Sequence, residues 1–224
     1  MQSPASTPAT LPFGEPTPLG LLGLSIGCGA LLPIAFGMIP TEPARAATMF
    51  STAAWFCLLF GAGCQFLAGI MSLANKNTLG GTLLTTFSFN WVMNWYALSE
   101  ASQGRAVDPS VVLSVDLTFL LVFVVLTYAF GFFSKLLFLF LLDIDALYLL
   151  RIARHFTAPA DALFGTLSLG IAIATVLLMV IALYIAFAML VNPASGRTIF
   201  PIAGPMWLPK PPASPTPASE REAG

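Results

Sequence analysis

Six long apolar segments constrain the fold more than any other feature of this sequence. They run over about 19–39, 49–73, 79–98, 111–132, 135–152 and 163–191, and a helix needs roughly 20 apolar residues to cross a bilayer. Only 8% of the residues are charged, against about 25% in soluble domains. Lipid must therefore be the solvent for most of the surface, and we predict an all-α membrane protein with six transmembrane helices per protomer.

The fourth and fifth segments are predicted to be separate helices. A single helix over 111–152 would be about 60 Å long, twice the hydrocarbon thickness. The break from Gly131 to Lys135 therefore predicts a tight turn. Six spans place both termini on one side of the membrane, which we take to be the cytoplasmic side of the plasma (inner) membrane. Basic residues are divided almost evenly between the two sides, so the positive-inside rule does not fix this orientation.

The two ends of the chain differ in composition from the membrane part. Residues 1–14 are rich in Ser, Thr and Pro, and residues 205–224 are dense in proline. Both tails are therefore predicted to be disordered, on either side of a membrane domain of residues 15–204. The net charge of −1 offers no basic stripe for nucleic acid. The sequence carries no catalytic or metal-binding motif, which argues against an enzyme, a cofactor or a metal site.

Polar side chains recur along the third segment at every fourth position: Thr82, Thr86, Asn90 and Asn94. Because four residues turn a helix by about 400°, this stripe drifts around the helix by about 40° per step. Phe87 and Trp91 form an aromatic stripe beside it. The polar stripe either lines a path for a small polar solute or bonds neighbouring helices. We favour the path, because the stripe includes two asparagines at membrane depth.

Three further polar residues lie inside apolar segments. Gln65 is the strongly polar side chain of the second segment, and path lining and helix packing are both open for it. Asp143 and Asp145 lie in the fifth, about 200° apart around a helix, so at least one is expected to meet another helix or be neutral. Intramembrane acids are functional candidates. We predict that Asp143 or Asp145 carries a proton, the alternative being a neutral packing residue.

Three stretches resemble motifs of the succinate–acetate permease (acetate uptake transporter) family. EPTPLGL at 15–21 is similar to the family's N-P-x-P-L-G-L signature. GCQFLAG at 63–69 and NTLG at 77–80 resemble its G-x-x-Q-x-x-A-G and N-T-x-G segments, and GRTIFPI at 196–202 resembles its G-R-T-x-x-P ending. The motif residues are Pro16, Pro18, Leu19, Gly20, Asn77, Thr78, Gly196, Arg197, Thr198 and Pro201.

The resemblance implies a six-helix protomer with its own solute path, assembled as a ring-like homo-hexamer. It implies passage of acetate and similar short carboxylates, usually coupled to protons, although channel-like behaviour is also proposed for the family. It further implies an apolar constriction in mid-path, at Leu24, Phe87 and a third residue near Asp143 and Asp145. Two departures bear on the solute, because Glu15 replaces the family's Asn and Phe87 stands where Tyr is common.

The sequence thus predicts a proton-linked transporter or channel for acetate-sized monocarboxylates, with succinate as a further candidate. Aromatic rings and Leu24 would pass the methyl end, and polar side chains would replace water around the carboxylate: Gln65, Thr86, Asn90 and Asn94. Because no Lys or Arg is expected in mid-path, the protonated acid, or an anion accompanied by a proton, should be preferred. Two alternatives stay open: a channel for neutral solutes such as ammonia or urea, and a non-transporting sensor or assembly subunit.

Overall fold

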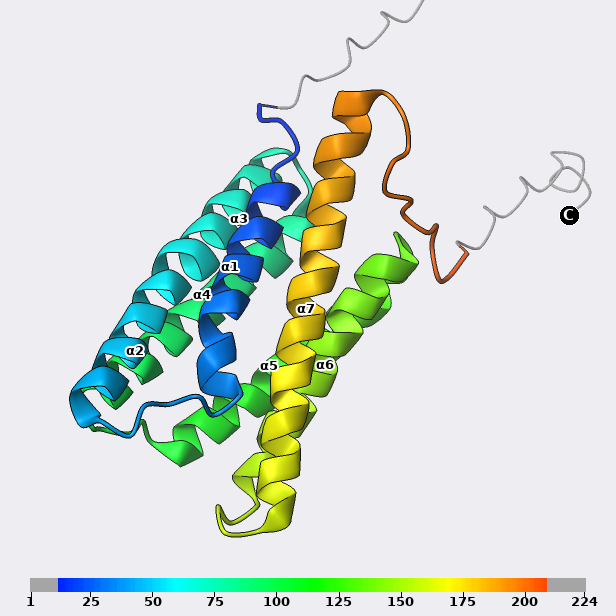
Figure 1. Ribbon diagram of the computed structural model, residues 1–224. Helices are drawn as coiled ribbons and strands as arrows, with labels where there is room; N and C mark the ends of the chain where they lie inside the picture. The colour runs from blue at the N-terminus through cyan, green and yellow to red at the C-terminus, as the bar shows by residue number, and fades with distance from the viewer. Residues whose placement is uncertain (1–11, 209–224) are drawn as a thin grey trace, which may run out of the picture.

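The structure, a computed structural model, describes residues 12–208, and within them every regular element is a helix. The elements are α1 Thr17–Ala35, α2 Pro43–Phe56, the π-helix η1 Cys57–Cys64, α3 Gln65–Ala74, α4 Thr78–Ser102, α5 Pro109–Phe130, α6 Lys135–His155 and α7 Ala162–Ser195. Because α2, η1 and α3 form one continuous rod, the described chain folds into six helical rods (Figure 1). Each predicted apolar segment overlaps one rod.

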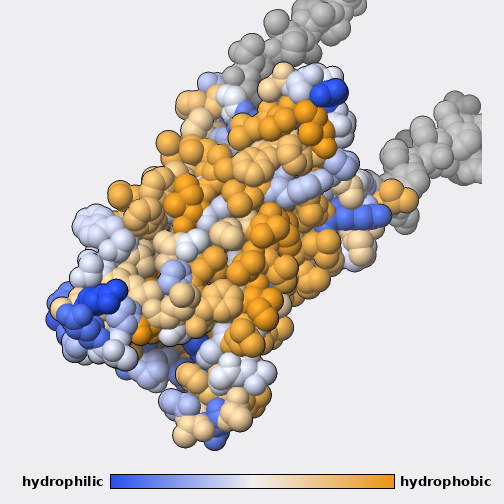
Figure 2. Space-filling view, in the orientation of Figure 1, coloured by the Kyte–Doolittle hydropathy of each residue, from blue (hydrophilic) through white to orange (hydrophobic). Residues whose placement is uncertain are grey.

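Four of these rods are long and apolar enough to cross a membrane: Thr17–Ala35, Pro43–Ala74, Pro109–Phe130 and Ala162–Ser195. Large apolar side chains such as Leu121, Val125 and Leu149 face outward from the bundle. Figure 2 shows that hydrophobic residues cover most of one face, with the strongest hydrophilic cluster at its lower-left end. These features are those of an integral membrane protein.

The helix α7 packs against α1 on one side and α6 on the other (Figure 1). The rod Pro43–Ala74 packs against α1 and α4, whereas α5 packs mainly against α6. The backbones of α4 and α6 do not pack closely together. The space between α4 and α6 is therefore available for side chains and cavities.

Glycines on one face of α1 allow it to pack closely against its neighbours. A Cβ atom on Gly20 would lie 2.9 Å from Leu84, and one on Gly27 would lie 2.9 Å from the ring of Trp91. At Gly23 the added atom would overlap the backbone oxygen of Phe60 and the side chain of Cys64, both in η1 of the neighbouring rod. Small residues let helices in membranes approach closely enough for extensive van der Waals contact.

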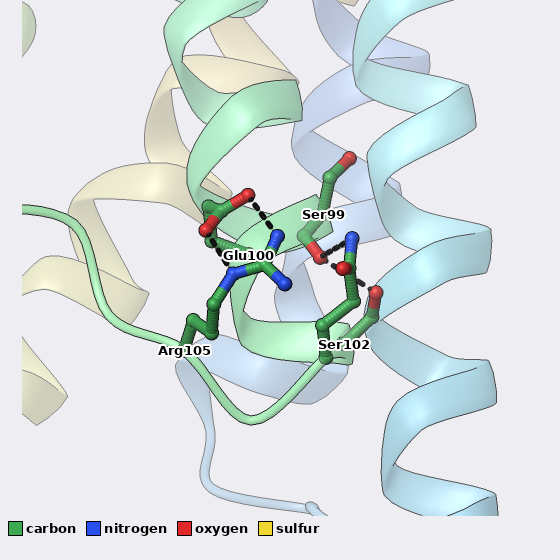
Figure 3. Close-up of polar contacts among 5 residues, drawn as sticks. Ser99, Glu100, Ser102 and Arg105 are labelled. Carbon is green, nitrogen blue, oxygen red and sulfur yellow. Dashed lines mark hydrogen bonds and ion pairs between the residues drawn. The ribbon is translucent and has the colours of Figure 1, made fainter.

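Local polar contacts fix the C-terminal end of α4 and the N-terminal end of α6. At the end of α4 the Arg105 guanidinium holds the Glu100 carboxylate at 2.6 and 2.8 Å, and the hydroxyl of Ser102 donates to the carbonyl of Ser99 (Figure 3). The predicted tight turn between α5 and α6 is confirmed, since α6 begins at Lys135 and the Ser134 hydroxyl accepts a bond from the first turn of α6.

Residues 205–208, which the sequence analysis assigned to the C-terminal tail, lie against the turn between α5 and α6. The backbone N–H groups of Met206 and Trp207 donate to the Gly131 carbonyl at 2.7 and 3.1 Å. The Trp207 indole donates to the Tyr128 carbonyl at 3.1 Å. The rest of both predicted tails, residues 1–11 and 209–224, falls outside the described residues.

Replacing Gly23 by Ala should destabilise the bundle. The new Cβ meets backbone as well as side-chain atoms of the neighbouring rod, so α1 must shift, and overpacking costs about 1–3 kcal/mol. Thermal unfolding in detergent measures the loss. Gly165→Ala is the matched control, because a Cβ there meets nothing within 4 Å. Equal unfolding temperatures for the two variants would contradict the packing described for α1.

Candidate solute path

A cavity with a volume of about 430 Å³ opens between α1, α4, α6 and α7. It is bounded by the C-terminal halves of α1, α4 and α6 and by the N-terminal half of α7. Its wall is partly apolar, and its polar residues are Asn90, Asn94, Tyr148, Arg151, Arg154, Ser168 and Thr175. We call it the wide cavity.

A smaller cavity of about 190 Å³ lies in the opposite half of the bundle. The first turns of α1 and α4 line it together with the residues that join α5 to α6, so it lies at the other ends of the same helices. Its polar wall consists of Glu15, Thr17, Gln65 and Asn77, and its remaining wall is largely apolar. We call it the narrow cavity.

An apolar partition separates the two cavities. The ring of Phe87 lines both of them. On α1 the fully buried Leu24 lies between Leu21, which faces the narrow cavity, and Cys28, which faces the wide one. Leu24 and Phe87, the two residues that the resemblance assigned to a constriction, therefore belong to one buried cluster between the cavities.

On α6 the partition falls at the position where the third constriction residue was expected. Phe140 lines the narrow cavity and Ile144 the wide one, while Leu141 between them has no exposed surface. Ile144 lies between Asp143 and Asp145 in sequence and is itself buried. The structure thus gives α6 two candidates, Leu141 and Ile144, for the remaining side of the constriction.

Aromatic rings extend the partition across the space between α4 and α6. Phe123 of α5 is fully buried and meets Phe87 edge to face, with 5.1 Å between ring centroids. Phe119 and Phe123 both stack on Tyr148 of α6 at 5.7 Å. The sequence analysis did not select these three residues. Phe119 and Phe123 are spaced four apart on α5, which placed them on one face, but their partners on α6 are set by tertiary packing.

The polar wall of the wide cavity includes two of the predicted path residues, Asn90 and Asn94. The Tyr148 hydroxyl donates to Oδ1 of Asn90 at 3.1 Å and so joins α6 to α4. The Asn90 amide N–H₂ group stays available to a solute. Thr86, one step earlier in the stripe, lines neither cavity, because the drift of the stripe turns it away.

Trp91 lines the wide cavity, and its indole is held in place by two glycines. A Cβ on Gly27 or Gly61 would fall within 3 Å of the ring, so the indole occupies the space that two side chains would otherwise fill. Gly61 belongs to the π-helix η1, a type of helix that is frequent at functional sites. The indole Nε1–H is buried and has no partner among the described residues, which leaves a donor at the edge of the cavity.

Gln65 begins α3 directly after η1 and lines the narrow cavity. The residue is 1% exposed, and its Oε1 atom has no hydrogen-bond partner among the described residues. Buried polar atoms are nearly always paired. An unpaired acceptor on a cavity wall is a place where a solute or water donates a hydrogen bond.

Two guanidinium groups on the last turns of α6 line the wide cavity, which the sequence analysis did not anticipate. Arg151 forms a two-point ion pair with Asp116 of α5, at 2.9 and 3.1 Å, and lies over the Tyr148 ring. Arg154 lies over the ring of Phe164 and has no ion-pair partner within residues 12–208. Among the described residues no Lys or Arg lies in the partition, which agrees with the expectation for mid-path. The wide cavity that leads to the partition does contain basic side chains.

The two aspartates proposed as proton carriers line neither cavity. Asp145 is buried against α5, where its Oδ2 atom accepts a bond of 2.7 Å from the Thr127 hydroxyl. Its Oδ1 atom and the Oδ2 atom of Asp143 are buried without a partner among the described residues. The expectation that at least one aspartate meets another helix is confirmed by Asp145.

The residues of the family motifs shape the ends of helices. The Glu15 carboxylate accepts the backbone N–H of Thr17 at 3.0 Å, and the Asn77 side chain caps α4 through Gly80 at 2.9 Å. Gly196 ends α7 with a φ of +65°, a conformation that glycine adopts without strain. Pro201 then receives the Tyr184 hydroxyl on its carbonyl at 2.9 Å. Glu15 and Asn77 also line the narrow cavity.

No family model matches the chain. A stretch of 92 residues, 41% of this chain and 32% of the relative, is 35% identical to the glyoxylate pathway regulator of Yarrowia lipolytica. A stretch of 113 residues, 47% of this chain and 38% of the relative, is 28% identical to ammonia transport outward protein 2 of Saccharomyces cerevisiae. The matches therefore span well under half the length of these curated relatives.

The fold is that of a solved membrane channel. The chain superposes on the structure of the bacterial acetate channel SatP with a TM-score of 0.69, covering 85% of this chain and 99% of that one at 18% identity. This likeness of fold to a solved acetate channel confirms the resemblance that the sequence motifs predicted.

Removing the Thr127 hydroxyl should weaken the packing of α5 on α6. Thr127→Val leaves the buried Asp145 carboxyl without its partner, and an orphaned buried group costs about 1–3 kcal/mol. The matched control is Thr118→Val on the exposed face of α5, whose hydroxyl bonds only to its own helix. The free energy of unfolding in detergent, measured for both variants, should fall only for Thr127→Val. An equal effect of both would contradict a stabilising role for the Thr127–Asp145 bond.

Proposed function

We propose that the chain forms a path by which acetate and similar short carboxylates cross the membrane. The observation that carries the proposal is the pair of cavities that approach from opposite halves of the bundle and meet at the ring of Phe87. A path of this form admits a small solute from both sides and resists water and larger solutes at its centre. The shared fold with a solved acetate channel supports this choice of solute.

In this proposal all six rods cross the membrane, including α4 and α6, which place Asn90, Asn94 and Tyr148 on the wall of the wide cavity. Each protomer holds its own path, and protomers assemble as a ring-like hexamer through their outward apolar faces. The membrane is the plasma (inner) membrane, with both termini in the cytoplasm. A solute then passes between the two sides without leaving one protomer.

The partition sets the form in which the solute passes. Moving an ionised carboxylate into apolar surroundings costs several kcal/mol or more, so the neutral acid crosses the partition more easily. In the wide cavity the amide groups of Asn90 and Asn94 bond the carboxyl group. In the narrow cavity the unpaired Oε1 of Gln65 accepts the acid O–H. Succinate would have to be neutralised at both ends, so acetate should pass faster.

Proton linkage is the finer part of the proposal, with Asp143 and Asp145 as the candidate carriers. Both have a buried carboxyl oxygen without a partner among the described residues, which is a site where a proton can reside. Because neither residue lines a cavity, an exchange with the solute requires water or a shift of α6. In this proposal the aspartates therefore exchange protons by way of water or a shift of α6. They do not contact acetate directly.

A second candidate function is a path for a neutral solute such as ammonia. One relative is named as an ammonia transport outward protein, and an apolar partition also suits a small uncharged solute. Flux measured with and without an imposed proton gradient separates the two functions. Labelled acetate should accumulate on the alkaline side, where acetic acid ionises, whereas ammonia should accumulate on the acidic side, where it is protonated.

Truncating the ring at the partition should widen the path. Phe87→Ala removes the side chain that lines both cavities, so uptake of labelled acetate into proteoliposomes should rise several-fold and larger carboxylates should begin to pass. Phe89→Ala is the matched control, because its ring is 54% exposed on the outer face of α4. Unchanged size selectivity in Phe87→Ala would place the barrier elsewhere.

Replacing the buried aspartates tests the proton link. We expect Asp143→Asn or Asp145→Asn to lower acetate uptake driven by an imposed proton gradient, because the amide cannot take up a proton. Exchange of labelled acetate at equal pH on both sides serves as the control, since it reports an intact path without net proton movement. Normal gradient-driven uptake in both variants would remove the aspartates from the mechanism.

A further inference from the structure

The wide cavity carries an excess of positive charge at its outer end. Its ionisable wall includes the guanidinium groups of Arg151 and Arg154 and, within the described residues, no carboxylate. Arg151 is neutralised by its two-point pair with Asp116. Arg154 is half-buried and forms no ion pair of its own within residues 12–208, and the nearby Asp116 carboxylate is already held by Arg151.

The position of Arg154 is fixed by packing. Its guanidinium group lies 5.6 Å from the centre of the Phe164 ring, a contact between a cation and an aromatic face that joins α6 to α7. Arg151 lies one turn earlier on the same face of α6, and Asn94 of α4 also lines the same cavity. A planar guanidinium group with free N–H groups binds a carboxylate through paired hydrogen bonds.

We propose that Arg154, with Arg151 and Asn94 beside it, forms a capture site for the ionised carboxylate of the solute at the mouth of the wide cavity. The inference rests on the proposed function, because it names the charge state in which the solute first binds. The narrow cavity has the opposite charge, since Glu15 is the ionisable group of its wall. Anion capture is therefore a property of the wide end alone.

The capture site is distinct from the partition. Ten residues separate Arg154 from Ile144, which corresponds to about 15 Å along α6. Acetate bound at Arg154 cannot reach the Phe87 ring at the same time. The site therefore raises the local concentration of the anion and acts on the apparent affinity for the solute, while the maximal rate is set further inside.

Binding and uptake of acetate by three variants test the site. In Arg154→Gln the apparent dissociation constant for labelled acetate, measured on the detergent-solubilised protein at low salt, should rise about tenfold, which matches one charged hydrogen bond. Uptake into proteoliposomes should show a similar rise in KM with little change in maximal rate. Arg154→Lys should retain part of the affinity. Arg105→Gln is the matched control. Arg105 lies in the exposed loop after α4, pairs with Glu100 at the end of that helix (Figure 3), and lines neither cavity.

The outcomes separate this inference from the proposed function. Normal binding and an unchanged KM in Arg154→Gln would overturn the capture site while leaving a carboxylate path intact. If the protein binds acetate through Arg154 but transports none across the membrane, the capture site is supported and the transport function is overturned. An oxyanion can also come from a lipid headgroup, so binding is repeated in nanodiscs with and without phosphatidylglycerol. Anionic lipid that binds through Arg154, with no effect of the substitution on acetate, would also overturn the proposal.

Discussion

A strongly polar side chain inside a bilayer must find a hydrogen-bond partner within the protein or face a cavity, and this requirement decides how α4, α5 and α6 meet. Asp145 meets Thr127, and Asp116 meets Arg151, so both acids join α5 to α6. Asn90 satisfies the requirement in both ways, because it bonds Tyr148 and also lines the wide cavity. The polar groups on α4 and α6 thus hold the helices together and mark where water and solute can enter.

The close packing of α1 leaves the bundle asymmetric. Three glycines bring α1 against the rod Pro43–Ala74 and against α4, and the Trp91 indole fills the last of that space. No comparable run of glycines joins α4 to α6, whose backbones stay apart. Aromatic rings fill the centre of that gap, since Phe87, Phe123 and Tyr148 meet there. The cavities above and below the rings follow from the same separation.

Helix positions were predictable from the sequence because apolar length and break residues are local signals, and the turn at 131–135 is an example. Gln65, Asn90 and Asn94 were recognised because polar residues are rare in apolar segments. Thr86, by contrast, lines neither cavity, because the direction of its side chain depends on a drift of the stripe that accumulates along α4. Phe123 and Arg154 were missed for another reason. An aromatic or basic residue on a helix has several ordinary roles. Only the packing of the helices sets Phe123 against the Phe87 ring and places Arg154 on the wall of the wide cavity.

The order of groups along the path bears on where the solute is protonated. A cationic mouth favours the ionised carboxylate, whereas the apolar partition favours the neutral acid. The proton must therefore be gained between Arg154 and Phe87. The wall there includes Asn90, Asn94, Tyr148, Trp91, Thr175 and the buried Cys28, and side chains of these types do not release a proton readily near neutral pH. Water in the wide cavity is then the nearest donor, and the aspartates of α6 act only if water or movement connects them to it. The rate of such a path should follow the acidity on the side of the wide cavity, whether water alone or water together with the aspartates delivers the proton.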